Sequence, residues 1–371
     1  MNVLVAVDKF KGTLTCFEAN SIIKSAILKV KPKYKVSTFP MADGGDGFSK
    51  VLKHYLKTKT VSLNTVDPLH RKVKGCYEWD SEGKIAIIEL AVASGIVLLK
   101  KHEFDPLATS TFGTGLLINH AIKKGAKKII LGLGGSATND GGMGIASALG
   151  FQFKDAMGNT LAPSGNALSK IKTIERPAKR IDVSILIACD VNNPLFGKNG
   201  AAYIYAPQKG ANPEQVKVLD KGLMNLSKRI EKYTSRNIGK LPGAGAAGGV
   251  PALLNGYFNC TMMNGIDLVI KYSSINKFLK KTNLLVTGEG KIDNQSISGK
   301  VVGSLVEIAN KNKIPVLLIA GMTEFPNKSP LNSHPIIQLV DAANDQVKAM
   351  KNAKKILFKK TQDFFLNPVK F

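Results

Sequence analysis

Short apolar runs alternate with amphipathic helical segments along most of the chain, and this alternation is the feature that most restricts the fold. Apolar strands are expected at residues 3–7, 128–133, 183–189, 284–287 and 316–320. Between them, apolar positions recur at the helical period, most clearly at 114–124, 213–233 and 301–311. Because buried strands separated by helices are typical of parallel sheets, the sequence predicts an α/β protein.

Local signals place some helix boundaries more closely. The stretch Thr15-Cys16-Phe17-Glu18 is a capping box, which predicts a helix that begins there and continues to about residue 30. A second helix is expected at about 46–57, with Asp46 as its N-cap. Gly125 is a plausible C-terminal glycine for the helix at 114–124.

The middle of the chain begins with a different pattern. Residues 61–89 are typical of antiparallel strands, with Ser81-Glu82-Gly83 as a turn between two of them. The βαβ pattern returns in the last third of the chain. We therefore expect two domains: an α/β domain built from 1–64 and 278–371, and an inserted α/β domain, 65–277, that contains the β-meander.

Composition excludes several classes of protein. The chain has 371 residues and 44% hydrophobic residues, and no apolar run approaches the roughly 18 residues of a membrane-spanning helix. Its four cysteines and five histidines show no metal-binding spacing, and the N-terminus does not resemble a signal peptide. These features favour a cytoplasmic protein with free thiols, without a membrane segment or a dedicated zinc site.

The formal net charge is +25, which is high for a chain of this length. The lysines are spread along the whole sequence and do not interleave with aromatic residues. This distribution favours attraction of an anionic small substrate over a nucleic-acid groove, although a basic nucleic-acid-binding protein stays open as a third alternative.

Glycine, carboxylate or lysine residues follow nearly every predicted strand. In open α/β sheets ligands bind beyond the carboxyl ends of the strands, so these segments are the candidate site. They are Asp8–Thr13, Gly134–Gly142, Asp190–Pro194, Gly288–Asp293 and Gly321.

The segment Gly134–Gly142 is the strongest single signal, with four glycines together with Ser136 and Thr138. Glycines let the backbone approach an anion, and the helix expected to start near residues 142–145 presents free N–H groups to a phosphate. Two more glycine-rich loops, Thr109–Gly115 and Pro242–Gly249, can each be a hinge or a packing contact when taken alone. Together, the three loops indicate a ligand with several phosphate or carboxylate groups.

The familiar nucleotide-binding signatures do not fit. No Walker A motif occurs, because Gly299-Lys300 is followed by Val301 and position 294 is Asn. Two strings match the dinucleotide fingerprint loosely, Gly132-x-Gly134-x-x-Ala137 and Gly243-x-Gly245-x-x-Gly248. An NAD-dependent oxidoreductase therefore stays open as the second alternative.

Taken in order, nine motifs resemble the bacterial glycerate kinases of the class without a P-loop. They are Asp8–Thr15, Pro40–Gly47, Ala93–Gly95, Thr109–Gly115, Gly134–Gly142, Cys189–Leu195, Pro207–Ala211, Pro242–Gly249 and Thr287–Gly290. Small departures are Lys9, where a serine is expected, and Asp46, where glutamate is common. The resemblance implies a Rossmann-like domain and a second α/β domain with the active-site cleft between them. It also implies ATP-dependent phosphorylation of D-glycerate, usually at the 2-hydroxyl, by a monomer or homodimer.

Phosphoryl transfer requires a base, cations for the anionic substrate and a metal, and the motifs contain candidates for each. Asp190 is the first candidate for the general base and Asp43 the second. Lys11 and Lys209 are candidates for the substrate carboxylate, together with Ser110 and Thr111. Asp8 and Asp293, helped by Glu289, are expected to hold Mg²⁺. The residues expected at the phosphates are Gly134, Gly135, Ser136, Ala137, Thr138, Asn139, Gly243, Gly245, Gly288 and Glu289.

Overall fold

A computed structural model describes residues 1–45, 47–293, 296, 300–324, 330–340 and 346–367. The chain divides into two compact units: unit 1 consists of Met1–Asp43 and Asn264–Phe371, and unit 2 of Gly44–Met263. These bounds differ from the predicted junctions near 64/65 and 277/278. The first difference arises because the strand at 59–66, counted with the N-terminal domain in the prediction, pairs within the sheet of unit 2. Domains that fold independently stay a prediction.

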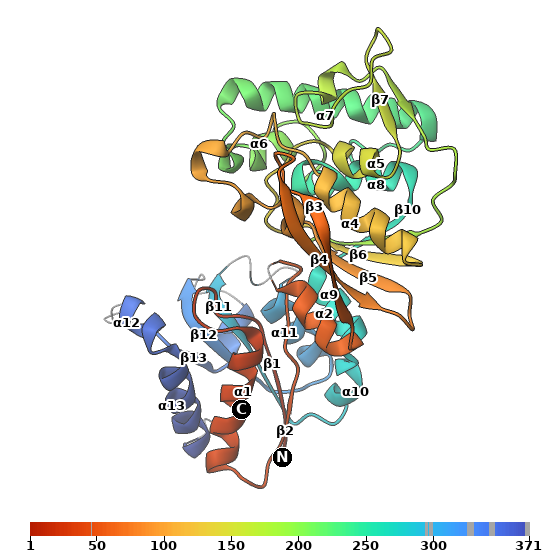
Figure 1. Cartoon of the computed structure of the whole chain (residues 1–371). Helices are drawn as coiled ribbons and strands as arrows, with labels where there is room; N and C mark the ends of the chain where they lie inside the picture. The colour runs from red at the N-terminus through yellow and green to blue at the C-terminus, as the bar shows by residue number, and fades with distance from the viewer. Residues whose placement is uncertain (46, 294–295, 297–299, 325–329, 341–345, 368–371) are drawn as a thin grey trace. The chain divides into compact units, whose positions relative to one another are not determined.

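Unit 1 is built on a five-stranded parallel sheet in the order β13-β12-β11-β1-β2. Its strands are β1 (Asn2–Val7), β2 (Lys35–Thr38), β11 (Leu284–Asp293), β12 (Val316–Glu324) and β13 (Ile336–Gln338). Its helices are α1 (Cys16–Val30), α9 (Gly265–Ser273), α10 (Ile275–Leu279), α11 (Val301–Lys311), the short η7 (Pro330–Ser333), α12 (Gln346–Lys351) and α13 (Ala353–Leu366). Figure 1 shows α1 and α13 packed side by side.

The order of strands in unit 1 reverses between β1 and β11. The crossover through α1 leads from β1 to β2, whereas the crossover through α11 leads from β11 to β12 in the opposite direction. Because such crossovers are right-handed, α1 and α11 cover opposite faces of the sheet. The carboxyl ends of β1 and β11 therefore form a topological switch point, the place where open α/β sheets bind ligands.

The sequence pattern explains why α1 begins and packs as it does. The capping box is present: the Thr15 hydroxyl accepts a hydrogen bond from the Glu18 N–H, and the Glu18 carboxylate accepts one from the Thr15 N–H. The predicted apolar positions Ile23 and Ile27 are fully buried against the β1 side chains and α13. The helix end that carries the capping box therefore lies directly after the loop that follows β1.

Unit 2 is built on a six-stranded mixed sheet in the order β10-β9-β6-β5-β4-β3. These strands are β3 (Lys59–Val66), β4 (Lys72–Asp80), β5 (Ile85–Glu89), β6 (Lys128–Gly132), β9 (Ser184–Ala188) and β10 (Asn259–Met263), with a separate hairpin of β7 (Gln152–Lys154) and β8 (Thr173–Glu175). The helices are α2 (Phe48–Leu56), α3 (Ala91–Ser94), η1 (Ile96–Leu98), η2 (Lys101–Glu103), α4 (Phe112–Lys123), α5 (Met143–Ala148), η3 (Leu168–Lys170), α6 (Ala201–Tyr205), η4 (Pro207–Lys209), α7 (Pro213–Thr234), η5 (Ala246–Gly248) and α8 (Val250–Tyr257).

The expected meander is confirmed, because β3, β4 and β5 pair antiparallel while β5, β6, β9 and β10 pair parallel. The parallel strands read as continuous apolar runs because both of their faces are buried, as Ile129, Ile130 and Leu131 illustrate with no exposed surface. Both sheets carry helices, so the α/β class predicted from the sequence is confirmed. None of the helices in the described part of the chain is long and apolar enough to cross a membrane.

One expected loop is a strand. The apolar run at 284–287 predicted a strand that ends before Gly288, but β11 continues to Asp293 and pairs with β12 over that length. Position 288 in this strand requires glycine, because a Cβ there would collide with the Ile319 carbonyl of the neighbouring strand. Gly288, Glu289 and Asp293 therefore lie on a strand and not in a loop beyond one. Asp46, the expected N-cap of α2, lies outside the described residues, and Gly47 is the N-cap.

Candidate active site

The loop after β6 forms the centre of the candidate site in unit 2. Gly134 and Gly135 are exposed, Ser136 is half-buried, and the chain then turns inward so that residues 137–140 are buried. Backbone hydrogen bonds tie the loop to α3 and η1, from the Ala137 N–H to the Ser94 carbonyl and from the Ile96 N–H to the Gly135 carbonyl. The loop is thus a fixed structure with an accessible glycine rim.

A buried lysine reaches this loop from η4. The Lys209 Nζ donates hydrogen bonds to the Ser136 hydroxyl at 2.9 Å and to the Thr138 carbonyl at 2.7 Å. Only 3% of the Lys209 surface is exposed, and burial lowers the pKa of its amine to about 7, an effect that the Asp140 carboxylate opposes. The structure therefore brings together Lys209, predicted at the substrate carboxylate, and Ser136 and Thr138, predicted at the phosphates.

Asp140 organises the same loop from inside. Its carboxylate accepts hydrogen bonds from the Thr111 hydroxyl and N–H, both at 2.8 Å, and from the N–H groups of Gly142 and Gly144. Burial nevertheless raises the pKa of Asp140 above its usual value. The Thr111 hydroxyl also accepts a hydrogen bond from the Ile145 N–H at 3.0 Å. Thr111 thereby joins the start of α4 to the start of α5.

Two neighbouring polar side chains have atoms without a partner among the described residues. Asn139 and Thr138 are fully buried, yet the Asn139 amide nitrogen and oxygen and the Thr138 hydroxyl have no hydrogen-bond partner among the residues that the structure describes. Buried polar groups are nearly always paired, so these atoms require an explanation such as water or a ligand. They lie next to the groups that Lys209 contacts, in the segment predicted to bind phosphate.

The loop containing Gly243 and Gly245 serves packing. A Cβ at Gly243 would press on the Val191 carbonyl and the Cys189 sulfur, and one at Gly245 would collide with the Pro194 carbonyl. Gly248, with a φ of +71°, abuts the backbone of residues 138–139, and its carbonyl accepts a hydrogen bond from the Gly141 N–H. These glycines let the loop Pro242–Gly249 pack closely against the loops that follow β6 and β9. Binding of phosphate by Gly243 and Gly245 stays a prediction.

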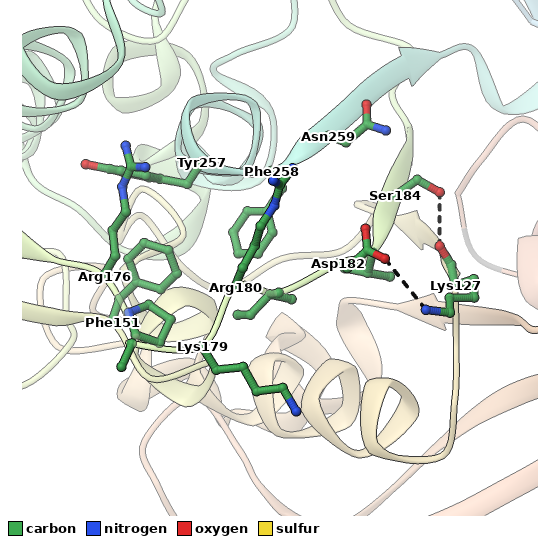
Figure 2. A pocket seen from close by; sticks show the side chains of 14 residues that line it. Lys127, Phe151, Arg176, Lys179, Arg180, Asp182, Ser184, Tyr257, Phe258 and Asn259 are labelled. Carbon is green, nitrogen blue, oxygen red and sulfur yellow. Dashed lines mark hydrogen bonds and ion pairs between the residues drawn. The ribbon is translucent and has the colours of Figure 1, made fainter.

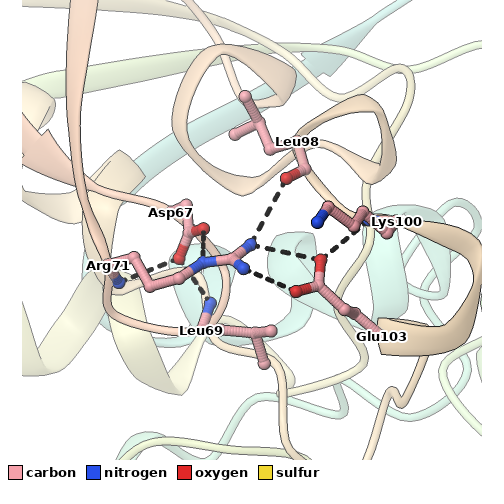
Figure 3. A network of polar contacts seen from close by, with 6 residues as sticks. All are labelled: Asp67, Leu69, Arg71, Leu98, Lys100 and Glu103. Atoms are coloured by element: carbon pink, nitrogen blue, oxygen red, sulfur yellow. Dashed lines mark hydrogen bonds and ion pairs between the residues drawn. The ribbon is translucent and has the colours of Figure 1, made fainter.

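A polar network supports the loop that carries Ser110 and Thr111. Figure 3 shows the Arg71 guanidinium between the carboxylates of Asp67 and Glu103, with Nε–Oδ2 and Nη1–Oε1 distances of 2.5 and 2.6 Å. This network joins the β3–β4 turn to η2. The β3–β4 turn also holds the loop that carries Ser110, because the Ser110 N–H donates a hydrogen bond to the Pro68 carbonyl. The Ser110 hydroxyl accepts a hydrogen bond from the Phe112 N–H, so it has a local structural role.

Asp190 follows β9 directly, as predicted. Its side chain is exposed, whereas the preceding Cys189 is buried. Because β6 and β9 are parallel neighbours, Asp190 lies at the same edge of the sheet as the loop after β6. Burial raises the pKa of the Cys189 thiol, and the nearby Asp190 charge adds to that rise.

Unit 1 gathers carboxylates at its topological switch point. Asp8 follows β1 and is 4% exposed, and its carboxylate accepts a hydrogen bond from the Lys9 N–H at 2.6 Å. Burial raises the pKa of Asp8 to about 7, and the charges of Asp43 and Glu289 add to this effect. The structure thus places three predicted site residues, from three different segments, within electrostatic reach of one another.

Glu289 lies on the neighbouring strand β11. Burial raises the pKa of its carboxyl group, an effect that the Ser296 hydroxyl and the Lys300 ammonium oppose and that Asp43 and Asp293 strengthen. Its Oε1 atom is buried with no hydrogen-bond partner in the described part of the chain. No group of three or more His, Cys, Asp or Glu side chains is close enough to hold a metal ion among the described residues.

Unit 1 also contains a small apolar hollow of about 210 Å³. It is lined in part by residues that follow Asp8 and Glu289 in the sequence. Its polar edge includes Lys11 and Lys291, and glycines 290 and 321 form part of its wall. The apolar lining comes mainly from Phe10, Met322, Leu339, Val340, Met350 and Ala353. Lys11 is exposed and lies at the rim of this hollow in unit 1. Lys209, the other lysine predicted to bind the substrate carboxylate, lies among the loops of unit 2.

Asp140 is the site residue that the sequence interpretation missed. It lies in the loop Gly134–Gly142, where the glycines and hydroxyls predict an anion site but give no role to the carboxylate. A usable signal was present, because an aspartate shortly before a helix start commonly accepts hydrogen bonds from the free N–H groups there. Asp140 does so for Gly142 and Gly144, at the start of α5.

Comparisons with known proteins identify the family of this chain. The profile of the glycerate kinase family matches residues 3–366. A glycerate kinase from Haemophilus influenzae is 39% identical over 326 residues, which cover 86% of each chain. A glycerate 2-kinase from Escherichia coli K12 is 37% identical over 86% of this chain and 85% of its own.

The similarity extends to three dimensions. A crystal structure from Salmonella typhimurium LT2, provisionally named glycerate kinase 2, superposes with a TM-score of 0.86 at 33% sequence identity. The match covers 99% of this chain and 97% of that one. The resemblance noted in the sequence motifs is therefore confirmed over the whole length: the chain belongs to the glycerate kinase family.

Proposed function

We propose that this protein transfers the γ-phosphate of ATP to D-glycerate, with the 2-hydroxyl as the favoured acceptor and the 3-hydroxyl as the alternative. Family membership supports the reaction, and the relative named glycerate 2-kinase supports the position of transfer. The observation that carries the proposal is Lys209, a buried cation held on the glycine-rich loop after β6. Such a cation fits an anionic substrate or phosphate group.

Binding of an anion would complete the surroundings of Lys209. Its two hydrogen bonds go to neutral oxygens, and burial alone disfavours its charged form. A carboxylate or phosphate beside Nζ would raise the pKa of the amine and hold it as ammonium. The unpaired Asn139 amide can donate to the same anion. We assign Lys209 and the loop Gly134–Asn139 to this role.

Asp190 is the proposed general base. A base must reach the attacking hydroxyl, and an exposed carboxylate after β9, at the same sheet edge as the loop Gly134–Asn139, meets that requirement better than a buried one. Thr111 and Ser110 act mainly by holding the loops, since their hydroxyls make internal hydrogen bonds. Asp43 remains the second candidate for the base.

Mg²⁺ fits the carboxylates of unit 1. Asp8 and Glu289 are buried carboxylates with raised pKa values, and the Oε1 atom of Glu289 lacks a partner in the described chain. A divalent cation would relieve the repulsion, and Mg²⁺ commonly takes one or two carboxylates with phosphates and water. When bound, it would neutralise charge on the transferred phosphate. We propose Asp8 and Glu289 as ligands, with Asp43 and Asp293 close by.

The adenine ring of ATP is the proposed occupant of the apolar hollow in unit 1. Ligand sites are mostly apolar with a few polar groups, and this hollow has apolar walls with Lys11 and Lys291 at its edge. Its lining comes in part from the loop after β1 and from the carboxyl-terminal parts of β11 and β12, the end at which open α/β sheets bind ligands. The protein is further proposed to act in the cytoplasm, as a monomer or homodimer, without nucleic-acid or membrane partners.

The test is an assay of purified protein with Mg-ATP and D-glycerate. We expect ADP that depends on glycerate, and ³¹P NMR of the product should show phosphate at the 2-position. A reaction without glycerate is the control for background ATP hydrolysis. If no ADP forms while a hydroxy acid reduces NAD, the oxidoreductase alternative is correct. Retention on DNA that falls steeply with salt would instead favour the nucleic-acid alternative.

A further inference from the structure

A second hollow in unit 2 lies away from the candidate active site. It has a volume of about 690 Å³ and is formed by the segment 176–184 with residues that immediately precede or begin β6, β9 and β10. These three strands are parallel, so the hollow lies at their amino ends. The loops with Lys209 and Asp190 follow the opposite ends of the same sheet. We refer to this hollow as the amino-end pocket (Figure 2).

The charge of the amino-end pocket is strongly positive. Its described lining contains Lys127, Arg176, Lys179 and Arg180 but a single acidic residue, Asp182. Asp182 pairs with Lys127 at 3.6 Å, and both side chains are largely exposed. A water-exposed pair of this kind contributes little, so at least three cations remain to attract an anion. A pocket with this balance of charge fits phosphate or carboxylate groups.

One wall of the pocket is aromatic. The ring centroids of Phe151 and Tyr257 are 5.1 Å apart, and those of Phe151 and Phe258 are 5.8 Å apart. The Arg176 guanidinium lies 4.9 Å from the centroid of the Tyr257 ring, a cation–π contact that holds this cation against the wall. Figure 2 shows Arg176, Tyr257 and Phe151 together at one end and the Lys127–Asp182 pair at the other.

The hydroxyl of Tyr257 is an independent sign of a ligand. It is buried and has no hydrogen-bond partner within the part of the chain that the structure describes. A buried tyrosine hydroxyl usually finds a partner, and leaving it unpaired has a cost. The Tyr257 ring lines the pocket, beside Arg176. A ligand oxygen in the pocket would satisfy this hydroxyl together with the guanidinium.

We propose that the amino-end pocket binds a nucleoside phosphate at a site separate from that of phosphoryl transfer. The phosphates would contact Arg176, Arg180 and Lys179, and the base would lie against the aromatic wall. The volume falls within the roughly 300–1,000 Å³ of small-molecule sites. Because the two sites follow opposite ends of one sheet, a ligand here does not compete directly for the Lys209 loop. The inference does not rest on the proposed kinase reaction.

Hydrogen–deuterium exchange during titration of the full chain with ADP tests the proposal locally. We expect protection of residues 176–184 and 257–260, with a dissociation constant raised at least tenfold in R176A/R180A. The matched control K123A/K124A removes the same charge from exposed lysines of unit 2 and should change the constant less than twofold. Protection in R176A/R180A at the wild-type ADP concentration would overturn the proposal, whether or not the protein phosphorylates glycerate.

Two further measurements separate a nucleotide site from a general anion site. Inorganic pyrophosphate should protect 176–184 more weakly than ADP, because it cannot use the aromatic wall. Equal protection by both would overturn assignment to a nucleoside phosphate. Tyr257→Phe should weaken ADP binding several-fold without lowering the melting temperature. If Tyr257→Phe raises the melting temperature and leaves ADP binding unchanged, the hydroxyl has no ligand role.

Discussion

Unit 1 and unit 2 both carry ionisable side chains at the carboxyl ends of parallel strands, but burial acts on opposite charges in the two. In unit 1 it raises the pKa of Asp8 and Glu289, which lie within reach of Asp43. In unit 2 it lowers the pKa of Lys209. Each group is held in surroundings that disfavour its own charged form, and this supports the proposal that a ligand of the opposite charge binds at each site. The type of residue that is buried at such a sheet edge, a carboxylate or a lysine, thus determines whether a cation or an anion is the favoured ligand.

The largest expected effect concerns Asp190, the carboxylate placed at the lysine-containing edge of unit 2. Asp190→Asn should lower kcat about 10²- to 10⁴-fold with a smaller change in KM, because a general base contributes about that much. Steady-state kinetics with D-glycerate measure both constants. Glu82→Gln, at an exposed carboxylate in the turn between β4 and β5 of unit 2, is the control and should leave kcat unchanged. A loss below about tenfold in Asp190→Asn would exclude Asp190 as the base.

Lys209 tests whether unit 2 is the anion site. Lys209→Met removes the buried charge but keeps the length of the side chain, and kcat/KM should fall roughly 10²- to 10³-fold because charge-assisted hydrogen bonds are lost. The free energy of unfolding at pH 7 should not fall, since the native state disfavours the charged amine. Lys221→Met, at an exposed position of α7, provides the comparison. Equal kinetics in both variants would show that the substrate anion binds elsewhere.

Asp8 tests the opposite charge in unit 1 through the pH dependence of stability. Its pKa is about 7 in the native state and lies near 4 when unfolded, so between these values the native state holds the proton that the unfolded state releases. Stability should therefore fall as pH rises from 4 to 7. Asp8→Asn should increase the free energy of unfolding at pH 8 by at most about 4 kcal/mol, with no gain near pH 4.

Urea unfolding of Asp8→Asn and of Asp363→Asn, an exposed control in α13, measures this effect. Adding Mg²⁺ at pH 8 extends the test, because a metal ligand should bind the ion as a carboxylate. Wild-type protein should then gain stability from Mg²⁺, and Asp8→Asn should gain less. If both proteins respond alike, Asp8 is not a ligand.

A smaller effect is expected where unit 2 uses polar groups to hold its loops. Thr111→Val keeps the shape of the side chain but leaves Asp140 with one donor fewer and the Ile145 N–H without its acceptor. We expect a loss of roughly 1–3 kcal/mol in the free energy of unfolding, measured by urea titration. Thr160→Val at an exposed position should change it by no more than about 0.5 kcal/mol. No difference between the two variants would contradict the structural role of Thr111.

Much of the fold could be predicted from local sequence, for particular physical reasons. The capping box at Thr15 and Glu18 acts within one helical turn, so its residues alone predict the start of α1. The turn at residues 81–83 likewise predicts the pairing of β4 and β5. The end of β11 could not be predicted in this way, because glycine in a strand depends on how closely the neighbouring strand approaches.

The same distinction between local sequence signals and tertiary contacts applies to the candidate site. The family order of the motifs and the loop Gly134–Gly142 were visible in the sequence, and Lys209 and Asp190 could be named there as candidates. Their chemistry was not, because a lysine looks the same in sequence whether it is exposed, as Lys11 is, or buried, as Lys209 is. Gly243 and Gly245 resemble a phosphate-binding loop in the sequence. Their close approach to the backbone of neighbouring loops is visible only in the structure.

By itself the sequence determined the α/β class, the membership of the glycerate kinase family and the segments that follow the strands. These properties follow from periodicity, local capping and motif order, which act over a few residues at a time. Only the tertiary structure decided which charges are buried, which polar atoms stay unpaired and which glycines face a neighbouring backbone. Burial and pairing depend on contacts between residues far apart in the chain, as between Lys209 and Ser136, and those contacts set the electrostatics of the site.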